Sequence, residues 1–267
     1  MKAHPTSSCY QPSFRSFRVP FLVAALALSV NATAATLVDL GTASGFAVLA
    51  GAGITNTGTT TITGDIGTFP TLSITGAGSI TLNGVNHGGD GVTQVAKTDL
   101  AAAYIAALGQ APDTTYAGAQ DLVGLTLASG VYKSDVSLGL SGVLTLDALG
   151  NPNAVWVFQM AETLTTGTGS VVNLINGAQA SNVFWQVGSS ATLGTNSDFS
   201  GTILALTSIT LTTGATVDGR MLASNGAVTM DSNTITNIPE PVGMILIVPA
   251  MAAMLLPRRR PACADHA

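Results

Sequence analysis

The sequence predicts a mainly β fold of the β-solenoid class, with one long α-helix packed alongside the stacked strands. Three observations predict it: a threonine motif returns at nearly regular intervals, short apolar alternations are broken by glycine along most of the chain, and one alanine-rich stretch has helical periodicity. A solenoid coil needs roughly 18 to 20 residues, and repetition at a fixed period is the signature of stacked repeats. The four copies of the motif begin at Thr163, Thr192, Thr210 and Thr229.

The N-terminal segment, residues 1–35, is predicted to be a secretory signal peptide. Arg15 and Arg18 precede an apolar run over residues 19–30, and the small-residue sequence Ala32-Thr33-Ala34 follows. A basic region, a short apolar region and a small-residue cleavage site in this order are typical of export signals. We therefore expect the protein to leave the cytoplasm.

The C-terminal segment, residues 238–267, has three parts in a fixed order. Pro239, Glu240 and Pro241 precede an apolar stretch over residues 242–256, and Arg258, Arg259 and Arg260 close it. This tail resembles the PEP-CTERM sorting signal of Gram-negative bacteria. The resemblance implies that this segment holds the chain at the membrane transiently, and that an exosortase reads the signal and removes the tail. A plain membrane anchor is the alternative, since about 15 apolar residues are slightly short of a span.

Residues 36–237 are predicted to form one domain. Both cysteines, Cys9 and Cys263, fall in the terminal segments, so stability must come from strand stacking and burial. Lys97, Lys133 and Arg220 are the basic residues of this region, against twelve carboxylates. This balance argues against nucleic acid as a partner.

Within the domain, strand patterns are interrupted once, by a helix over about residues 91–108. Residues 46–82 and 113–235 show short apolar alternations and glycine turns, whereas the intervening stretch repeats apolar residues at helical spacing. Gly109 and Pro112 supply stop signals for this helix. The narrow small-residue stripe of this helix should lie flat against the solenoid. The residues at helical spacing are Val92, Val95, Ala96, Leu100, Ala103, Tyr104, Ala107 and Leu108.

The second half of the domain aligns on itself, one coil against the next. Residues 199–205 match residues 217–223, so Ile203 and Met221 should occupy equivalent positions in neighbouring coils. The longest interval between threonine motifs, from Thr163 to Thr192, is assigned to a loop near residues 176–181. Aromatic residues cluster at residues 156–159 and 184–187, and about half of these rings are predicted to fill the wider part of the core rather than to stack on a sugar.

Several stretches, in order and spacing, resemble the bacterial and fungal ice-binding (antifreeze) proteins. They include Leu40 to Ala50, Ile62 to Gly67, Gly130 to Tyr132, Trp156 to Gln159, Asn182 to Val187 and Gly214 to Arg220. The resemblance implies a discontinuous right-handed β-helix of triangular cross-section, in which the C-terminal coil packs beside an N-terminal coil. It also implies ice binding through one flat face, thermal hysteresis and inhibition of ice recrystallisation. Residues 213–216 and 57–60 fit the family's Thr-(Ala/Gly)-x-(Thr/Asn) pattern.

The candidate ice-contacting face is a column of threonines that alternate with core residues such as Leu164, Leu193, Leu211 and Met230. A bland explanation is that threonine favours exposed strands in general. The candidate residues are Thr163, Thr165, Thr192, Thr195, Thr210, Thr212, Thr213 and Thr229, with Thr61 and Thr63 as an extension if the end coils meet.

Two alternative functions remain open: a non-catalytic adhesin or exopolysaccharide-matrix protein and, with less support, a polysaccharide-active enzyme. Enzymes of the latter kind need convergent carboxylates with a base or a cationic partner, and no such constellation recurs on the repeated strands. His87 and Asp90 are interpreted as a loop leading into the helix rather than a metal site. The sequence predicts no cofactor, a monomer, and a location outside the cell or on the outer envelope of a Gram-negative bacterium.

Overall fold

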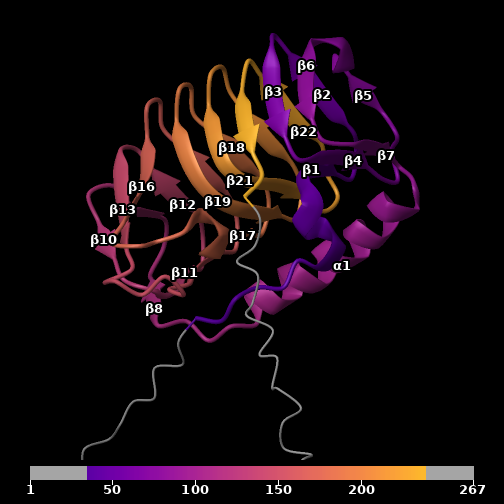
Figure 1. The fold of residues 1–267 in the computed structure, drawn as a ribbon. Helices are drawn as coiled ribbons and strands as arrows, with labels where there is room; N and C mark the ends of the chain where they lie inside the picture. Colours follow the sequence, from indigo (N-terminus) through magenta and orange to yellow (C-terminus); the bar gives the residue numbers. More distant parts are fainter. Residues whose placement is uncertain (1–34, 239–267) are drawn as a thin grey trace, which may run out of the picture. The chain divides into compact units, whose positions relative to one another are not determined.

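A computed structural model describes residues 35–238, which form 23 strands, one α-helix and three short 3-10 helices (Figure 1). All paired strands run parallel and stack into coils, each of which contributes one strand to each of three faces. The mainly β, stacked architecture with one α-helix is thus confirmed. The 3-10 helices are Gly41–Gly45, Ala77–Ser79 and Ala180–Asn182.

The first face is a separate eight-stranded sheet, called here the eight-stranded face. Its strands are two to four residues long. In three of them, the residues directly before and after an outward-facing threonine are buried in the core. In spatial order they are β5 (Ile74–Thr75), β2 (Ile54–Thr57), β22 (Val228–Asp231), β20 (Ile209–Leu211), β18 (Ala191–Leu193), β15 (Leu164–Thr166), β12 (Leu138–Leu140) and β9 (Gln120–Asp121).

The other two faces belong to one 15-stranded sheet that bends around a corner. Two long strands, β19 (Asp198–Ala205) and β21 (Thr216–Ala223), begin on one of these faces and end on the other. The helix-covered face holds β7 (Asn86–Gly88), β4 (Asp65–Thr68), β1 (Phe46–Ala50), the ends of β21 and β19, β17 (Val183–Val187), β14 (Trp156–Met160), β11 (Gly130–Ser134) and β8 (Thr114–Tyr116). The third face holds β6 (Ile80–Asn83), β3 (Thr60–Thr63), β23 (Thr234–Thr236), the beginnings of β21 and β19, β16 (Val171–Ile175), β13 (Val143–Asp147) and β10 (Thr126–Leu127).

The stack is discontinuous in sequence. The N-terminal coil of β1, β2 and β3 pairs strand by strand with the C-terminal coil of β21, β22 and β23. In Figure 1 the indigo strands therefore lie directly beside the yellow ones. A further N-terminal coil, β4 to β6, then extends the stack beyond the first. The expected contact between the end coils is confirmed.

The helix α1 (Gly91–Leu108) has the predicted bounds and joins the two ends of the stack, from β7 to β8. Asp90 caps it by accepting a hydrogen bond from the Thr93 backbone N–H at 2.9 Å. Eighteen residues span about 27 Å, most of the length of the stacked strands. The helix contacts β7, β14, β17 and β19 along this path.

The buried stripe of α1 is narrow and consists mainly of small residues, as predicted. Small residues and one leucine face the sheet, namely Thr93, Ala96, Leu100, Ala103 and Ala107. Val92, Val95 and Leu108, which share the helical spacing, are 43–52% exposed and lie outside this stripe. Positions three and four apart share one helix side, so a stripe centred on the alanines turns these larger side chains outward.

The aromatic clusters fill the core, as predicted. Phe158 pairs in register with Trp185, and the two rings stack with centroids 4.0 Å apart. Tyr132 and Phe199 extend the stack on either side at 5.5 and 5.1 Å. Both tryptophans are fully buried, which removes them from any sugar-binding surface.

The predicted self-alignment is also confirmed, since β19 and β21 pair from Phe199 with Val217 through Ala205 with Ala223. The coil with the predicted loop runs from Trp156 to its partner Val183, slightly fewer residues than the interval from Thr163 to Thr192. Its additional residues form the connection between β16 and β17, where the loop was predicted.

Two stacked glycines let β19 and β21 turn the corner between faces. Gly201 and Gly219 pair with each other and have φ values of +116° and +152°. A Cβ atom on Gly219 would collide with the carbonyl oxygen of Gly201. The close stacking of successive coils therefore requires glycine at this corner.

Replacing Gly219 with alanine is expected to destabilise the fold by more than about 2 kcal/mol, because the new Cβ meets a backbone atom that cannot move freely. Chemical denaturation monitored by circular dichroism measures this. Gly78→Ala is the matched control: it adds the same methyl group where nothing lies within 4 Å and φ is not positive. Equal stabilities for the two variants would contradict the role of the corner.

Candidate functional site

One uninterrupted column of threonines runs along the eight-stranded face. Thr165 pairs with Thr192, which pairs with Thr210, and Thr210 pairs with Thr229. Thr229 also pairs with Thr55 of the N-terminal coil, which pairs with Thr75. We call these residues the threonine ladder: Thr165, Thr192, Thr210, Thr229, Thr55 and Thr75.

The ladder is held flat by the core beneath it. Leu193, Leu211 and Met230, each adjacent to a ladder residue, are at most 1% exposed, and so is Leu164. The inward orientation predicted for these four is therefore confirmed. With about 4.8 Å between neighbouring strands, five steps give the ladder a length of about 24 Å.

The hydroxyl groups of the ladder are available to water. Among the hydrogen bonds of residues 35–238, none involves the side-chain oxygen of a ladder threonine. The β-branched side chain has restricted χ1 freedom, so each rung presents a methyl and a hydroxyl with little conformational disorder. The ladder thus forms a regular row of apolar and hydrogen-bonding groups.

Thr163 does not belong to this column, contrary to the sequence alignment. It precedes β15 at the edge of the face, and its hydroxyl lies 3.0 Å from that of Ser137. The residue in register with Thr192 is Thr165. Because side chains alternate with a period of two, a slip of two residues leaves the inward and outward pattern unchanged and is invisible in the sequence.

Thr195, Thr212 and Thr213 also lie at the edge, in the turns that follow β18 and β20. Their hydroxyls are engaged within the protein: Thr195 donates to Thr212, Thr212 to the Leu193 carbonyl, and Thr213 to Asp231. They border the ladder without continuing its pattern of free hydroxyls.

Thr61 and Thr63 do not extend the ladder, because β3 belongs to the third face. The ladder continues instead through Thr55 and Thr75, which sequence reasoning missed. The signal for an outward Thr55 was its position between Ile54 and Asn56, both of which are buried.

The two stretches that fit the Thr-(Ala/Gly)-x-(Thr/Asn) pattern each turn a corner between two faces. Thr60 is buried in β3, and Thr216 begins β21 on the third face.

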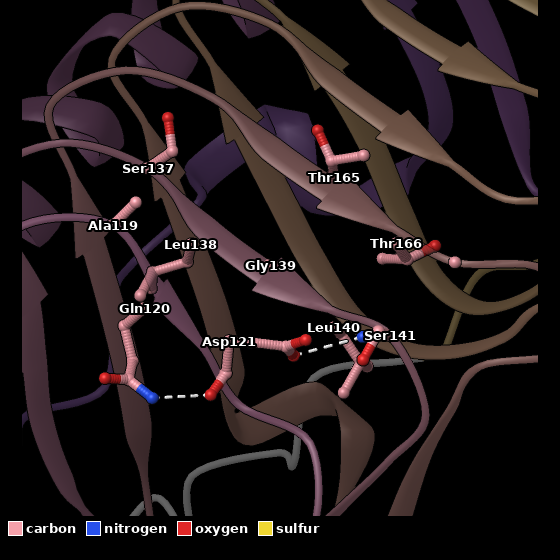
Figure 2. A pocket seen from close by; sticks show the side chains of 11 residues that line it. Ala119, Gln120, Asp121, Ser137, Leu138, Gly139, Leu140, Ser141, Thr165 and Thr166 are labelled. Atoms are coloured by element: carbon pink, nitrogen blue, oxygen red, sulfur yellow. Dashed lines mark hydrogen bonds between the residues drawn. The ribbon is translucent and has the colours of Figure 1, made fainter.

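The ladder stops at Gly139, which pairs with Thr165 on one side and Asp121 on the other. Figure 2 shows the resulting hollow, which has a volume of about 500 Å³ and is lined by the backbone and side chains of β9, β12 and β15. The glycine, with Asp121 beyond it, ends the column of threonines.

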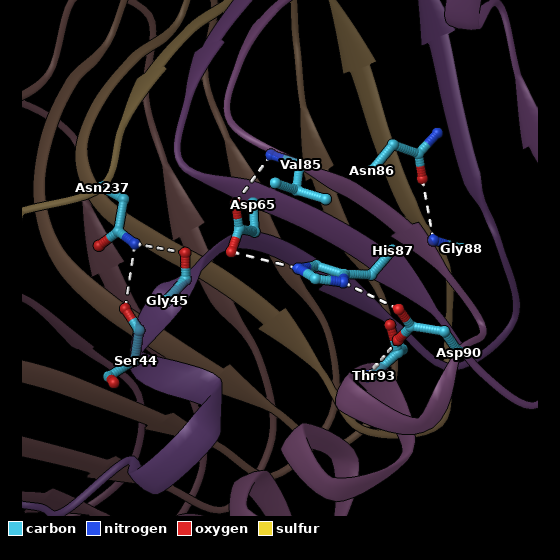
Figure 3. Close-up of polar contacts among 10 residues, drawn as sticks. All are labelled: Ser44, Gly45, Asp65, Val85, Asn86, His87, Gly88, Asp90, Thr93 and Asn237. Atoms are coloured by element: carbon cyan, nitrogen blue, oxygen red, sulfur yellow. Dashed lines mark hydrogen bonds and ion pairs between the residues drawn. The ribbon is translucent and has the colours of Figure 1, made fainter.

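His87 lies away from the ladder, at the entrance to α1. Its Nδ1 is 2.9 Å from Asp90 and its Nε2 is 3.4 Å from Asp65, so the imidazole bridges β4 and the helix cap (Figure 3). The hydrogen bond with Asp90 raises the pKa of His87 above 6.5, and burial opposes this. No group of three His, Cys, Asp or Glu side chains within residues 35–238 is placed to hold a metal ion.

The predicted export and sorting signals lie outside the described residues, apart from Ala35 and Ile238 at their borders. This applies to Pro239, Glu240, Pro241, Arg258, Arg259 and Arg260. Within residues 35–238, no helix has the length and apolar character needed to cross a membrane.

Comparison with known proteins gives a consistent result. A family model described as Ice-binding-like matches residues 48–236. An ice-binding protein of Nostoc sp. (strain HG1) is 45% identical over 247 residues, covering 88% of this chain and 91% of the relative. An ice-binding protein of Flavobacterium frigoris (strain PS1) is 37% identical over 220 residues, covering 76% of this chain and 77% of the relative.

Solved structures agree. The crystal structure of an ice-binding protein from the Antarctic ascomycete Antarctomyces psychrotrophicus superposes with a TM-score of 0.73 at 48% identity, covering 75% of this chain and 98% of the other. A domain of Shewanella frigidimarina ice-binding protein 1 superposes with a TM-score of 0.70 at 32% identity, covering 76% of this chain and 98% of the other.

His87 offers a pH-dependent test of the helix anchor. Because its pKa is raised in the folded protein, its contribution to stability is expected in full below about pH 6.5 and to be lost as the pH rises through the folded value. NMR titration of residues 35–238, where His87 is the one histidine, measures this pKa. Asp90→Asn should lower it. An unchanged pKa in that variant would mean that the contact with Asp90 does not control the imidazole.

Proposed function

The chain belongs to the ice-binding-like family, and from this premise we propose that it adsorbs to ice through the threonine ladder. The relatives named above are ice-binding proteins, which supports the activity; the ladder supports the location. The observation that carries the proposal is the register of six outward threonines with free hydroxyls on one flat face.

Ice is an ordered, repetitive ligand, and the ladder suits it for that reason. Methyl groups at regular intervals order neighbouring water, and hydroxyls anchor that water by hydrogen bonds. Each contact is weak, but contacts made simultaneously by a rigid row add to tight adsorption. Ice then grows with curvature between bound molecules, which lowers the local freezing point and slows recrystallisation.

The general preference of threonine for exposed strands is a weaker explanation. Propensity accounts for single threonines scattered over a surface. It does not account for six in one column, contributed by coils that include both ends of the described chain. It also does not explain why the edge threonines engage the protein while the ladder hydroxyls stay free.

The proposed activity is non-catalytic. On residues 35–238 the ladder carries no carboxylate or base among its six members, and the His87 cluster anchors the helix. An adhesin or exopolysaccharide-matrix protein is the second candidate, favoured by the sorting-type tail. That function does not require a regular threonine face.

We take the stacked coils to form a right-handed helix, as the family resemblance implies. Residues 1–35 direct export, and the tail from Pro239 to Arg260 holds the chain at the membrane transiently until an exosortase removes it. The mature protein is then a monomer, secreted or on the outer envelope of a Gram-negative bacterium, with exopolysaccharide as a further partner.

Thr210→Tyr is expected to remove most ice adsorption and to lower thermal hysteresis by about tenfold or more, because a protruding ring prevents neighbouring rungs from engaging together. Thr210 is half-buried and central in the ladder, between Thr192 and Thr229. Ice-affinity partitioning and hysteresis of purified residues 36–237 measure the effect.

Ala102→Tyr, on the exposed side of α1, is the matched control for this variant. It adds a similar ring far from the ladder and should retain full activity, while both variants keep their stability within about 0.5 kcal/mol. Full ice activity in a folded Thr210→Tyr protein would exclude the ladder as the main contact surface. Absence of the wild-type protein from ice would favour the matrix function, and carbohydrate binding would be assayed next.

Gly139→Thr is expected to raise thermal hysteresis by adding a seventh rung. A Cβ atom at this position would lie 3.8 Å from the carbonyl oxygens of Gln120 and Thr165, an ordinary contact, so the strand tolerates a side chain. Gly139→Ala is the control, because it fills the same backbone position without the hydroxyl. A folded Gly139→Thr protein no more active than Gly139→Ala would show that ladder length does not set the activity.

A further inference from the structure

The third face carries a second, separate arrangement of threonines. Thr216 pairs with Thr234, Thr234 with Thr61, and Thr61 with Thr81. These four residues come from β21, β23, β3 and β6, at the end of the stack where the N-terminal coils join the C-terminal coil. The column is thus assembled from segments that are distant in the sequence.

A second column runs beside the first, two residues further along each strand. It contains Thr236, Thr63 and Asn83, paired in that order, and Asp218, the partner of Thr236, lies at its end. The residues between the columns point inward: Val217, Ile235 and Ile62 are at most 1% exposed. Neighbouring strands are about 4.8 Å apart and the columns about 6.6 Å apart, so the seven positions form a two-dimensional array.

The array is accessible and its hydroxyls are mostly free. Thr234 and Thr81 are exposed and Thr61 is half-buried, and none of the three makes a side-chain hydrogen bond to another residue of the described chain. Thr216 differs, because it donates to Asp198 at 3.1 Å. The helix α1 packs on the helix-covered face and leaves this face open within residues 35–238.

The array has a defined boundary. Asp198 follows Thr216 in the first column, and Val171 follows Asp198. A carboxylate binds its hydration water strongly and in its own geometry, and a valine offers no hydroxyl. The pattern that suits ordered water therefore ends at Thr216 in the first column and at Thr236, before Asp218, in the second.

We propose that this array is a second ice-binding surface, distinct from the threonine ladder and turned toward a different direction. The inference rests on the proposed function, because it uses the same chemistry of ordered methyl and hydroxyl groups. It adds a structural distinction: the ladder is long and one residue wide, whereas the array is short and two residues wide. Two surfaces of different geometry match different planes of the ice crystal.

The test compares single and double substitutions. Thr234→Tyr blocks the array at a central rung, Thr210→Tyr blocks the ladder, and the double variant blocks both. Asn173→Tyr is the matched control, since Asn173 is exposed on β16 of the same third face but lies outside the array. Each protein carries a fluorescent label, and its binding to a single-crystal ice hemisphere reveals the planes that it occupies. Thermal denaturation establishes that each variant is folded.

We expect Thr210→Tyr to keep binding to a subset of the wild-type planes, Thr234→Tyr to lose that subset, and the double variant to lose all plane binding. Asn173→Tyr should match wild type. Complete loss in Thr210→Tyr alone, with Thr234→Tyr identical to Asn173→Tyr, would overturn the second surface while leaving the proposed function intact. Failure of the wild-type protein to bind any plane would instead overturn the proposed function and this inference with it.

Discussion

The parallel register between successive coils is the constraint on which the rest of the structure depends. Each inward residue lies above its equivalent in the next coil, as Ile203 lies beside Met221 and Phe158 beside Trp185. Because the backbone hydrogen bonds fix the spacing between strands at about 4.8 Å, the outward residues inherit the same spacing. The stacking of the core residues and the spacing of the threonine columns are therefore set by the same strand register.

The junction between the two chain ends is held by polar groups as well as by strand pairing. Arg220 is fully buried at this junction; it donates to the carbonyl oxygens of Ser44 at 2.9 Å and Ile238 at 2.6 Å, and to the Thr202 hydroxyl. Lys97 of α1 donates to the carbonyl oxygens of Ala223 and Ser224. A buried cation without such partners would cost several kcal/mol, so these contacts make the closed junction the favourable arrangement.

The sequence was sufficient for features that repeat locally. The helix follows from its cap at Asp90 and its period, and the pairing of residues 199–205 with 217–223 follows from two coils of equal length. Thr163 was misaligned because its coil contains an insertion and a two-residue slip keeps every side chain on its face. Thr61 was assigned to the wrong face because strands on all three faces alternate in the same way, and the corner positions leave no separate signal. Thr55 was missed because its partner Thr229 is far away in the sequence.

The discontinuous order of the coils has a consequence for when the surface comes into existence. Thr55 and Thr75 occupy one end of the ladder, Thr165 the other, and Thr229, which joins them, lies in the last coil before the tail. The contact between Ile54 and Val228 joins the beginning of the domain to its end, and contacts between such distant parts of a chain form late in folding. A chain still emerging from the ribosome carries two separate fragments of the ladder. The full row first exists once synthesis has passed residue 229, so a prematurely terminated product lacks the continuous surface even where its earlier coils are intact.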